Sequence, residues 1–160
     1  MRPMRRSDRE VTDAARIEQI VQSCGCMRVG FNDGGEVYIV PLSFGYEIEN
    51  GRYRFYFHGA SEGRKAELIR DEPRVGFEMD AAYRVYGEGD MACAYSAAFV
   101  SVIGTGRMCF VTDAVEKQAG LQAIMQHTAG RGEWEFDRSM LEKVCVMRLD
   151  VETMSAKEHK

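Results

Sequence analysis

Two turn signals divide the first part of the chain into short strands. Asn32-Asp33-Gly34-Gly35 and Glu49-Asn50-Gly51 consist of residues that tolerate positive φ, and such turns join antiparallel neighbours. The segments beside them, residues 26–31, 37–46 and 52–58, are apolar or alternate between apolar and polar side chains. The pattern predicts three antiparallel strands in a meander, so the chain is expected to consist mainly of antiparallel sheet.

The stretch from Arg52 to Pro73 combines the third of these strands with a helix. Alternating aromatic residues predict a strand that ends at Gly59, and a short turn then leads into a helix with Arg64 and Lys65 in its first turn. The helix dipole disfavours cations there, whereas unpaired N–H groups beside two cations suit an anion such as a phosphate. The other interpretation, a solvated turn with both cations facing water, fits this stretch equally well.

The rest of the chain adds further strands and helices. Periodicity and caps predict the following segments: helices at 12–23, 64–71 and 113–127, one helical turn at 139–141, and strands at 74–80, 99–112 and 144–151. Residues 81–98 are expected to form a loop with at most a short strand. Pro41 indicates an edge, a bulge or backbone that faces something other than a strand, and Gly104 and Gly106 indicate a bulge, a bend or close approach of a ligand. About six strands predict a mainly β (α+β) fold, a closed or partly closed barrel with helices at its ends.

Composition limits the class of protein. The 160 residues suit one domain, residues 1–160, with 45% hydrophobic content and a net charge of −4, which does not favour general nucleic-acid binding. No apolar run approaches the ~20 residues of a membrane span, and the basic N-terminus lacks the apolar core of a secretory signal. The five cysteines form no CxxC pair, so we expect a reduced cytoplasmic protein without a metal site.

Several motifs in this order resemble the pyridoxamine-phosphate-oxidase-like FMN-binding split barrels, and most closely their nitroimidazole-resistance branch. The motifs are Arg5-Arg6-x-Asp8-Arg9-Glu10, residues 38–46 (YIVPLSFGY), residues 56–65 (YFHGASEGRK), Ser101-Val102-Ile103-Gly104-x-Gly106 and Glu116-Lys117. They cover nearly the whole chain, and the third-strand motif followed by Gly-Arg-Lys is the most specific. The resemblance implies an antiparallel six-stranded split β-barrel with flanking helices.

The resemblance also implies a homodimer with FMN at the subunit interface. It assigns the FMN phosphate to Arg64 and Lys65, and the isoalloxazine edge to backbone around Val40 and Pro41. The remaining residues implied to contact the flavin are Phe57, His58, Gly59 and Ser101, with Ser101 often supplied by the other subunit. True pyridoxamine phosphate oxidases carry a further basic C-terminal segment for the substrate phosphate. The mixed tail after Arg148 lacks it, which argues against that substrate.

Three functions follow as hypotheses. The first is an FMN-dependent oxidoreductase that takes electrons from a nicotinamide or other donor and reduces a small aromatic or nitro-aromatic acceptor, with His58 as a catalytic proton donor. The second is a non-enzymatic flavin- or haem-binding carrier or sensor, in which His58 could be an axial haem ligand. The third is a dimeric domain without a cofactor, which leaves Pro41 and the Arg64-Lys65 pair unexplained. From the residues alone, a satisfied strand-end histidine is the favoured interpretation of His58, and the resemblance shifts it toward a role in the site.

Overall fold

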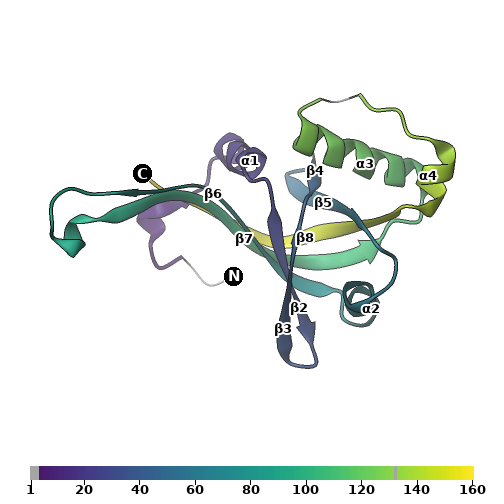
Figure 1. Cartoon of the computed structure of the whole chain (residues 1–160), viewed down its shortest axis with the longest axis horizontal. Coiled ribbons are helices and arrows are strands. Elements are labelled where there is room, and N and C mark those ends of the chain that lie inside the picture. Colours follow the sequence, from purple (N-terminus) through teal and green to yellow (C-terminus); the bar gives the residue numbers. More distant parts are fainter. Residues whose placement is uncertain (1–3, 132) are drawn as a thin grey trace.

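The computed structural model describes residues 4–131 and 133–160, which form one antiparallel sheet with helices packed around it (Figure 1). The sheet order is β3-β2-β6-β7-β8-β5-β4, and β1 pairs with β8. The strands are β1 Glu10–Val11, β2 Met27–Asp33, β3 Glu36–Leu42, β4 Gly45–Glu49, β5 Arg52–Gly59, β6 Arg74–Tyr86, β7 Ser96–Phe110 and β8 Cys145–His159. The helices are α1 Ala14–Ser23, α2 Arg64–Asp71, α3 Ala114–Ala129 and α4 Arg138–Lys143, with 3-10 turns at Ser7–Arg9 and Ala92–Ala94. The predicted mainly antiparallel class is confirmed, and the sheet has two open ends, β3 and β4.

The core lies inside the curved sheet. Alternate residues of β2 and β5 face inward, and Phe55 and Phe57 are fully buried there with Met79 and Met147. A second, smaller buried cluster on the opposite face of β5 joins Tyr56 to α3. The two faces of β5 therefore have different partners, the core on one side and α3 on the other.

The predicted helices are confirmed because their capping residues work as expected. Asp13 and Asp113 begin α1 and α3, and each side chain accepts a hydrogen bond from a backbone N–H in the first turn. Asp137 caps α4 in the same way, so the single turn expected at 139–141 is a short helix. Gly130, with φ 72°, ends α3 in the left-handed conformation.

The predicted meander is wrong at residues 37–46. This segment forms two strands, β3 and β4, which stand at opposite ends of the sheet and pair with different neighbours. Gly45 explains part of the break, since a Cβ there would lie 2.2 Å from the backbone of Ala123 in α3. Its missing side chain lets β4 pack directly on that helix. Pro41 lies on an edge strand, one of the places predicted for it.

Three strands are longer than predicted. Residues 81–98 contain the ends of β6 and β7, which continue as a hairpin arm that extends from the body of the molecule (Figure 1). β8 runs on to His159 because the polar tail pairs with β7, where Phe99 is opposite His159. The register of β7 and β8 shifts between Thr105 and Gly106, which confirms the bulge at these glycines. The extra strand β1 and the division of residues 37–46 give eight strands in place of six.

Candidate functional site

The start of α2 lies at the end of β5 and differs from the other α-helix starts. Its N-cap is Gly63, with φ 90°, and no side chain caps it, whereas aspartates cap α1, α3 and α4. The helix is held in place by its buried face, which includes Leu68 and Ile69. Its first-turn N–H groups therefore lie at a fixed position without a side-chain acceptor, which suits an anion.

Lys65 is a half-buried cation beside this helix start. Its Nζ lies next to Gly59, where a Cβ would come within 2.8 Å of the nitrogen. Burial lowers the pKa of Lys65 below its ordinary value of 10.5, and nearby Cys145 acts in the opposite direction. Within residues 4–131 and 133–160, no carboxylate forms an ion pair with Lys65. A desolvated ammonium without a counter-ion is the main electrostatic feature of this site.

Arg64 contacts other residues than Lys65 does. Its guanidinium reaches the β2–β3 hairpin, where Nε and Nη2 lie 2.6 Å and 2.5 Å from Asp33 Oδ2. The guanidinium also lies over the Tyr38 ring, 4.2 Å from its centroid. The predicted basic pair is thus divided: Arg64 is neutralised by Asp33, while Lys65 is not.

The contacts of Arg64 with the β2–β3 hairpin place the edge strand β3 next to the start of α2. β3 pairs with β2 on one side, and it is the terminal strand of the sheet, so its other side presents backbone groups without a strand partner. Val40 packs inward against the core and Pro41 is exposed. Among the described residues, this arrangement leaves backbone N–H and C=O groups without a strand partner near the α2 start.

The end of β5 presents its residues in alternating directions. Phe57 is fully buried in the core, so only its backbone is open to a ligand, and Gly59 lies beside Lys65. His58 points to the opposite face from Phe57 and is exposed. Lys65 Nζ, beside Gly59, and the His58 imidazole therefore lie on different faces of the strand.

Ser101 lies far from this site within one chain. It is nine positions along β7 from Phe110, and Phe110 is in register with Met147, which pairs with Phe57. At the rise of a β-strand, nine residues correspond to about 30 Å. The structure does not bring Ser101 to α2 within one chain.

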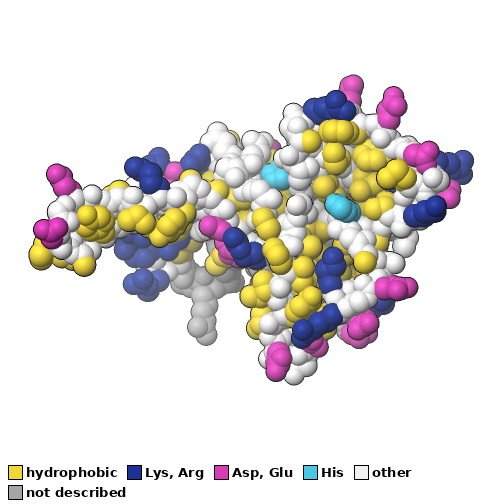
Figure 2. Space-filling model, in the orientation of Figure 1, with side chains coloured by type: hydrophobic (Ala, Val, Ile, Leu, Met, Phe, Trp, Pro, Cys, Tyr) yellow, Lys and Arg dark blue, Asp and Glu magenta, His cyan; other side chains and the backbone are white. Residues whose placement is uncertain are grey.

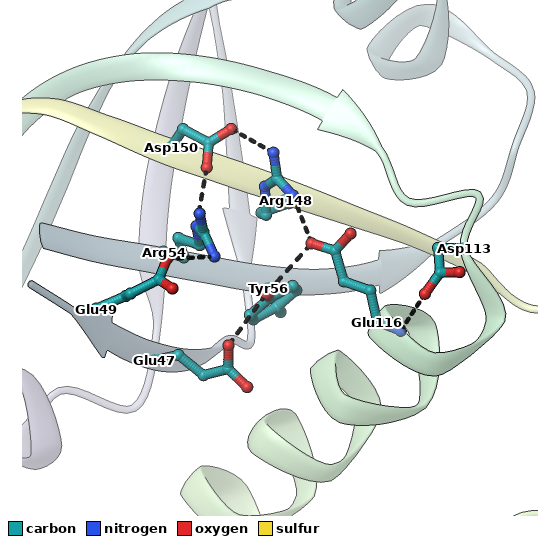
Figure 3. Close-up of polar contacts among 8 residues, drawn as sticks. All are labelled: Glu47, Glu49, Arg54, Tyr56, Asp113, Glu116, Arg148 and Asp150. Atoms are coloured by element: carbon teal, nitrogen blue, oxygen red, sulfur yellow. Dashed lines mark hydrogen bonds and ion pairs between the residues drawn. The ribbon is translucent and has the colours of Figure 1, made fainter.

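A cluster of charges that sequence reasoning missed lies between β5, β8 and α3 (Figure 3). Arg148 donates from Nη1 to Glu116 Oε1 at 2.5 Å and from Nη2 to Asp150 Oδ2 at 2.8 Å. Arg54 pairs with Asp150 and with Glu49. The alternation of Arg148 and Asp150 on one face of β8 is a sequence signal, but their partners come from strands and a helix far along the chain.

The same cluster includes a buried tyrosine between two carboxylates. The Tyr56 hydroxyl lies 3.2 Å from Glu47 Oε2 and 3.4 Å from Glu116 Oε1 (Figure 3). Burial raises the pKa of Tyr56 well above its ordinary value, and Glu47 and Glu116 raise it further. Tyr56 therefore stays protonated and joins α3 to β4 and β5, which makes this cluster a structural tie.

Among the residues that the structure describes, no group of three or more His, Cys, Asp or Glu side chains is arranged to hold a metal ion. No helix in residues 4–131 and 133–160 is long and apolar enough to cross a membrane.

The sequence profile of the pyridoxamine 5'-phosphate oxidase family matches residues 13–158. The chain belongs to this family. No curated protein matches it significantly. A candidate 5-nitroimidazole antibiotic resistance protein from Bacteroides thetaiotaomicron has a similar structure, with a TM-score of 0.79 at 27% identity over 93% of this chain and 86% of that one. The family and the split-barrel class predicted from the sequence are confirmed.

More distant solved structures share the fold. A flavocytochrome from Azotobacter vinelandii gives a TM-score of 0.76 at 19% identity, covering 99% of this chain and 72% of that one. An FAD-binding protein from Mesorhizobium loti gives 0.64 at 21% identity, covering 93% and 96%. The structural relatives of this split barrel thus include flavin-binding proteins.

Proposed function

We propose that the protein binds FMN at the start of α2 and uses it as an oxidoreductase that reduces a small aromatic or nitro-aromatic acceptor. The observation that carries the proposal is the half-buried Lys65 ammonium, which has no carboxylate partner in the described part of the chain and lies at an uncapped helix start. A phosphate would supply the missing negative charge and accept the free N–H groups. The nitroimidazole-resistance relative supports the choice of acceptor.

The residues present fit such a cofactor. Gly59 leaves room beside Lys65 that a larger side chain would fill, since a Cβ there would crowd Nζ. Arg64 keeps Nη1 free for the same phosphate, because Asp33 takes Nε and Nη2. The open edge of β3 around Val40 and Pro41 offers backbone groups to the ring system.

The chain's own residues would bind and orient the cofactor. When bound, FMN accepts and donates electrons in one- or two-electron steps. Lys65 holds the phosphate, buried Phe57 keeps the strand behind it rigid, and the exposed His58 imidazole can deliver a proton to an acceptor. His58 can serve this role for an acceptor on the outer face of β5, away from Lys65.

A second copy of the chain would complete the site. The outer face of β3 and β7 exposes Val37 at 75%, Ile39 at 60% and Ile103 at 54%, and hydrophobic side chains gather over β2 and β3 (Figure 2). Ile39, Gly30, Gly76 and Thr105 are paired in one row across four neighbouring strands. Because the two central residues are glycines, this face has a shallow apolar hollow. An apolar face of this kind suits a homodimer interface, and the partner copy would be the source of Ser101.

A flavin- or haem-binding carrier is the second candidate. The exposed His58 side chain favours it, because an unburied imidazole is available as an axial ligand. Structural relatives include a flavocytochrome and an FAD and heme binding protein from Mycobacterium smegmatis. Both functions use the same fold and differ in whether electrons reach a small acceptor.

The visible absorption spectrum of the purified protein separates these candidates. We expect a flavin band after addition of FMN that bleaches with NADH or NADPH and returns when a nitroimidazole is added. A flavin band that never bleaches would favour the carrier, and a Soret band would favour haem. Absence of any bound chromophore after addition of FMN or haem would contradict the proposed function.

A further inference from the structure

Asp33 holds Arg64 across the open edge of the sheet. Asp33 is the last residue of β2, whereas Arg64 begins α2, 31 positions later. Two guanidinium nitrogens contact one carboxylate oxygen, and the Tyr38 ring supports the guanidinium from beneath. Both side chains are partly exposed, at 52% for Arg64 and 35% for Asp33, so the pair forms a rim of the site and not part of the core.

The rim is acidic beyond Arg64. Asp33 is directly opposite Glu36 in the β2–β3 register, so two carboxylates stand at the end of this hairpin. Basic and acidic side chains adjoin one another around the hairpin end and α2 in Figure 2. An anion entering the site therefore finds an uncompensated cation at Lys65 and carboxylates on the hairpin side.

We propose that Asp33 restricts this site to ligands that end in a single phosphate and disfavours those with a diphosphate, such as FAD. The inference rests on the proposed function. The first phosphate binds Lys65, the free N–H groups of α2 and Nη1 of Arg64. A second phosphate needs another cation, but the remaining guanidinium nitrogens are held by Asp33, whose carboxylate also repels it.

Tyr38 is a positioning residue in this arrangement. Its ring lies under the guanidinium and favours the orientation in which Nε and Nη2 face Asp33. It acts through Arg64 and needs no contact with the ligand. Tyr38→Leu is therefore expected to loosen the selectivity in the same direction as Asp33→Asn, while Tyr38→Phe keeps the ring and the selectivity.

The test measures the dissociation constants of FMN and FAD by quenching of flavin fluorescence. Asp33→Asn is expected to tighten FAD about fivefold, the magnitude of one partly exposed ion pair, and to change FMN by less than twofold. Glu36→Gln is the matched control, since it removes the same charge from the hairpin without touching Arg64. Arg64→Met leaves Asp33 unpaired and is expected to shift the FAD-to-FMN ratio the opposite way.

Each outcome has a defined meaning. A wild-type protein that binds neither flavin would overturn the proposed function, whatever the variants do. If wild type binds FMN and the FAD-to-FMN ratio is unchanged in Asp33→Asn, the assignment of Asp33 is wrong. An equal effect of Glu36→Gln would also overturn it, because the selectivity would then be a general effect of net charge.

Discussion

The charged cluster around Arg148 and the start of α2 differ in whether their cations are neutralised. Arg148 contacts Glu116 and Asp150, and Arg54 beside it contacts Glu49 and shares Asp150. At α2, Arg64 is paired with Asp33, but Lys65 is half buried without an acidic partner among the described residues. One cluster is complete within the chain, and the other lacks an anion.

The difference indicates which charges serve the fold and which serve a ligand. Removing a charge from water is costly, so a partly buried ion is normally paired. The Arg148 cluster follows this rule and links β5, β8 and α3. Lys65 departs from it, and the cost of its partial burial is offset when an anion binds.

Lys65→Met is expected to weaken FMN binding most. A hydrogen bond to a charged group contributes about 1.5–3 kcal/mol, which is roughly 10- to 100-fold in the dissociation constant. The variant should fold as well as wild type, because it removes an unpaired cation. Flavin fluorescence quenching measures the affinity and thermal unfolding checks the fold. Unchanged FMN affinity in a folded variant would remove Lys65 from the site.

Arg148→Met is expected to destabilise the fold and leave FMN affinity unchanged. The side chain is only 23% exposed, and its loss leaves Glu116 and Asp150 without their shared cation, at a cost of about 2 kcal/mol. Arg138→Met is the matched control, since its pair with Glu142 is exposed and should contribute less than about 0.5 kcal/mol. Urea unfolding measures both. Equal stability of the two variants would contradict the structural role of the Arg148 cluster.

Much of this architecture could be predicted from local sequence. The turn glycines and the Asp13, Asp113 and Asp137 caps act over a few residues, so strands and helices near them were predicted correctly. The division of residues 37–46 was missed because it depends on the contact between Gly45 and α3, almost 80 positions away. The long β8 was missed because its polar tail becomes a strand only by pairing with β7.

Only the part of the candidate site that depends on local sequence could be predicted. Arg64 and Lys65 are adjacent in the sequence, and the helix start that holds them has a local pattern. The Arg64–Asp33 pair, which divides their roles, joins residues 31 positions apart. The Arg148–Glu116 pair joins residues 32 positions apart and carries no local signal. Distant pairings of this kind follow from the sheet order, which single-sequence periodicity does not determine.

Gly59→Ala is expected to weaken FMN binding less than Lys65→Met does. The added methyl would lie 2.8 Å from Lys65 Nζ and 3.3 Å from the Met147 methyl, both flexible ends, so the fold should adapt. Displacing the ammonium should reduce affinity on the order of threefold, part of one charge-assisted hydrogen bond. Gly25→Ala is a control, because nothing lies within 4 Å of its Cβ position. A larger loss than in Lys65→Met would show that Gly59 contacts the ligand in its own right.

The pH dependence should give the smallest effect. The pKa of Lys65 is lowered in the ligand-free protein, so the unfolded chain binds more protons, and stability should rise as pH increases through the window just below 10.5. FMN binds more tightly when the Lys65 amine is charged than when it is neutral. The affinity of the protein for FMN should therefore fall as the pH rises through that same window. Titrations above pH 8 keep the phosphate a dianion. Lys65→Arg should abolish the fall, and a fall that persists in this variant would assign it to another group.

A comparison of FMN with riboflavin, which has the same ring system and no phosphate, tests whether Lys65 binds a phosphate. Their dissociation constants are measured for wild type and for Lys65→Met under identical conditions. If Lys65 binds the phosphate, wild type should bind FMN at least tenfold more tightly than riboflavin, and the ratio should fall roughly tenfold in the variant, to what the α2 N–H groups and Arg64 Nη1 still contribute. Equal affinities for the two flavins in wild type would contradict the account.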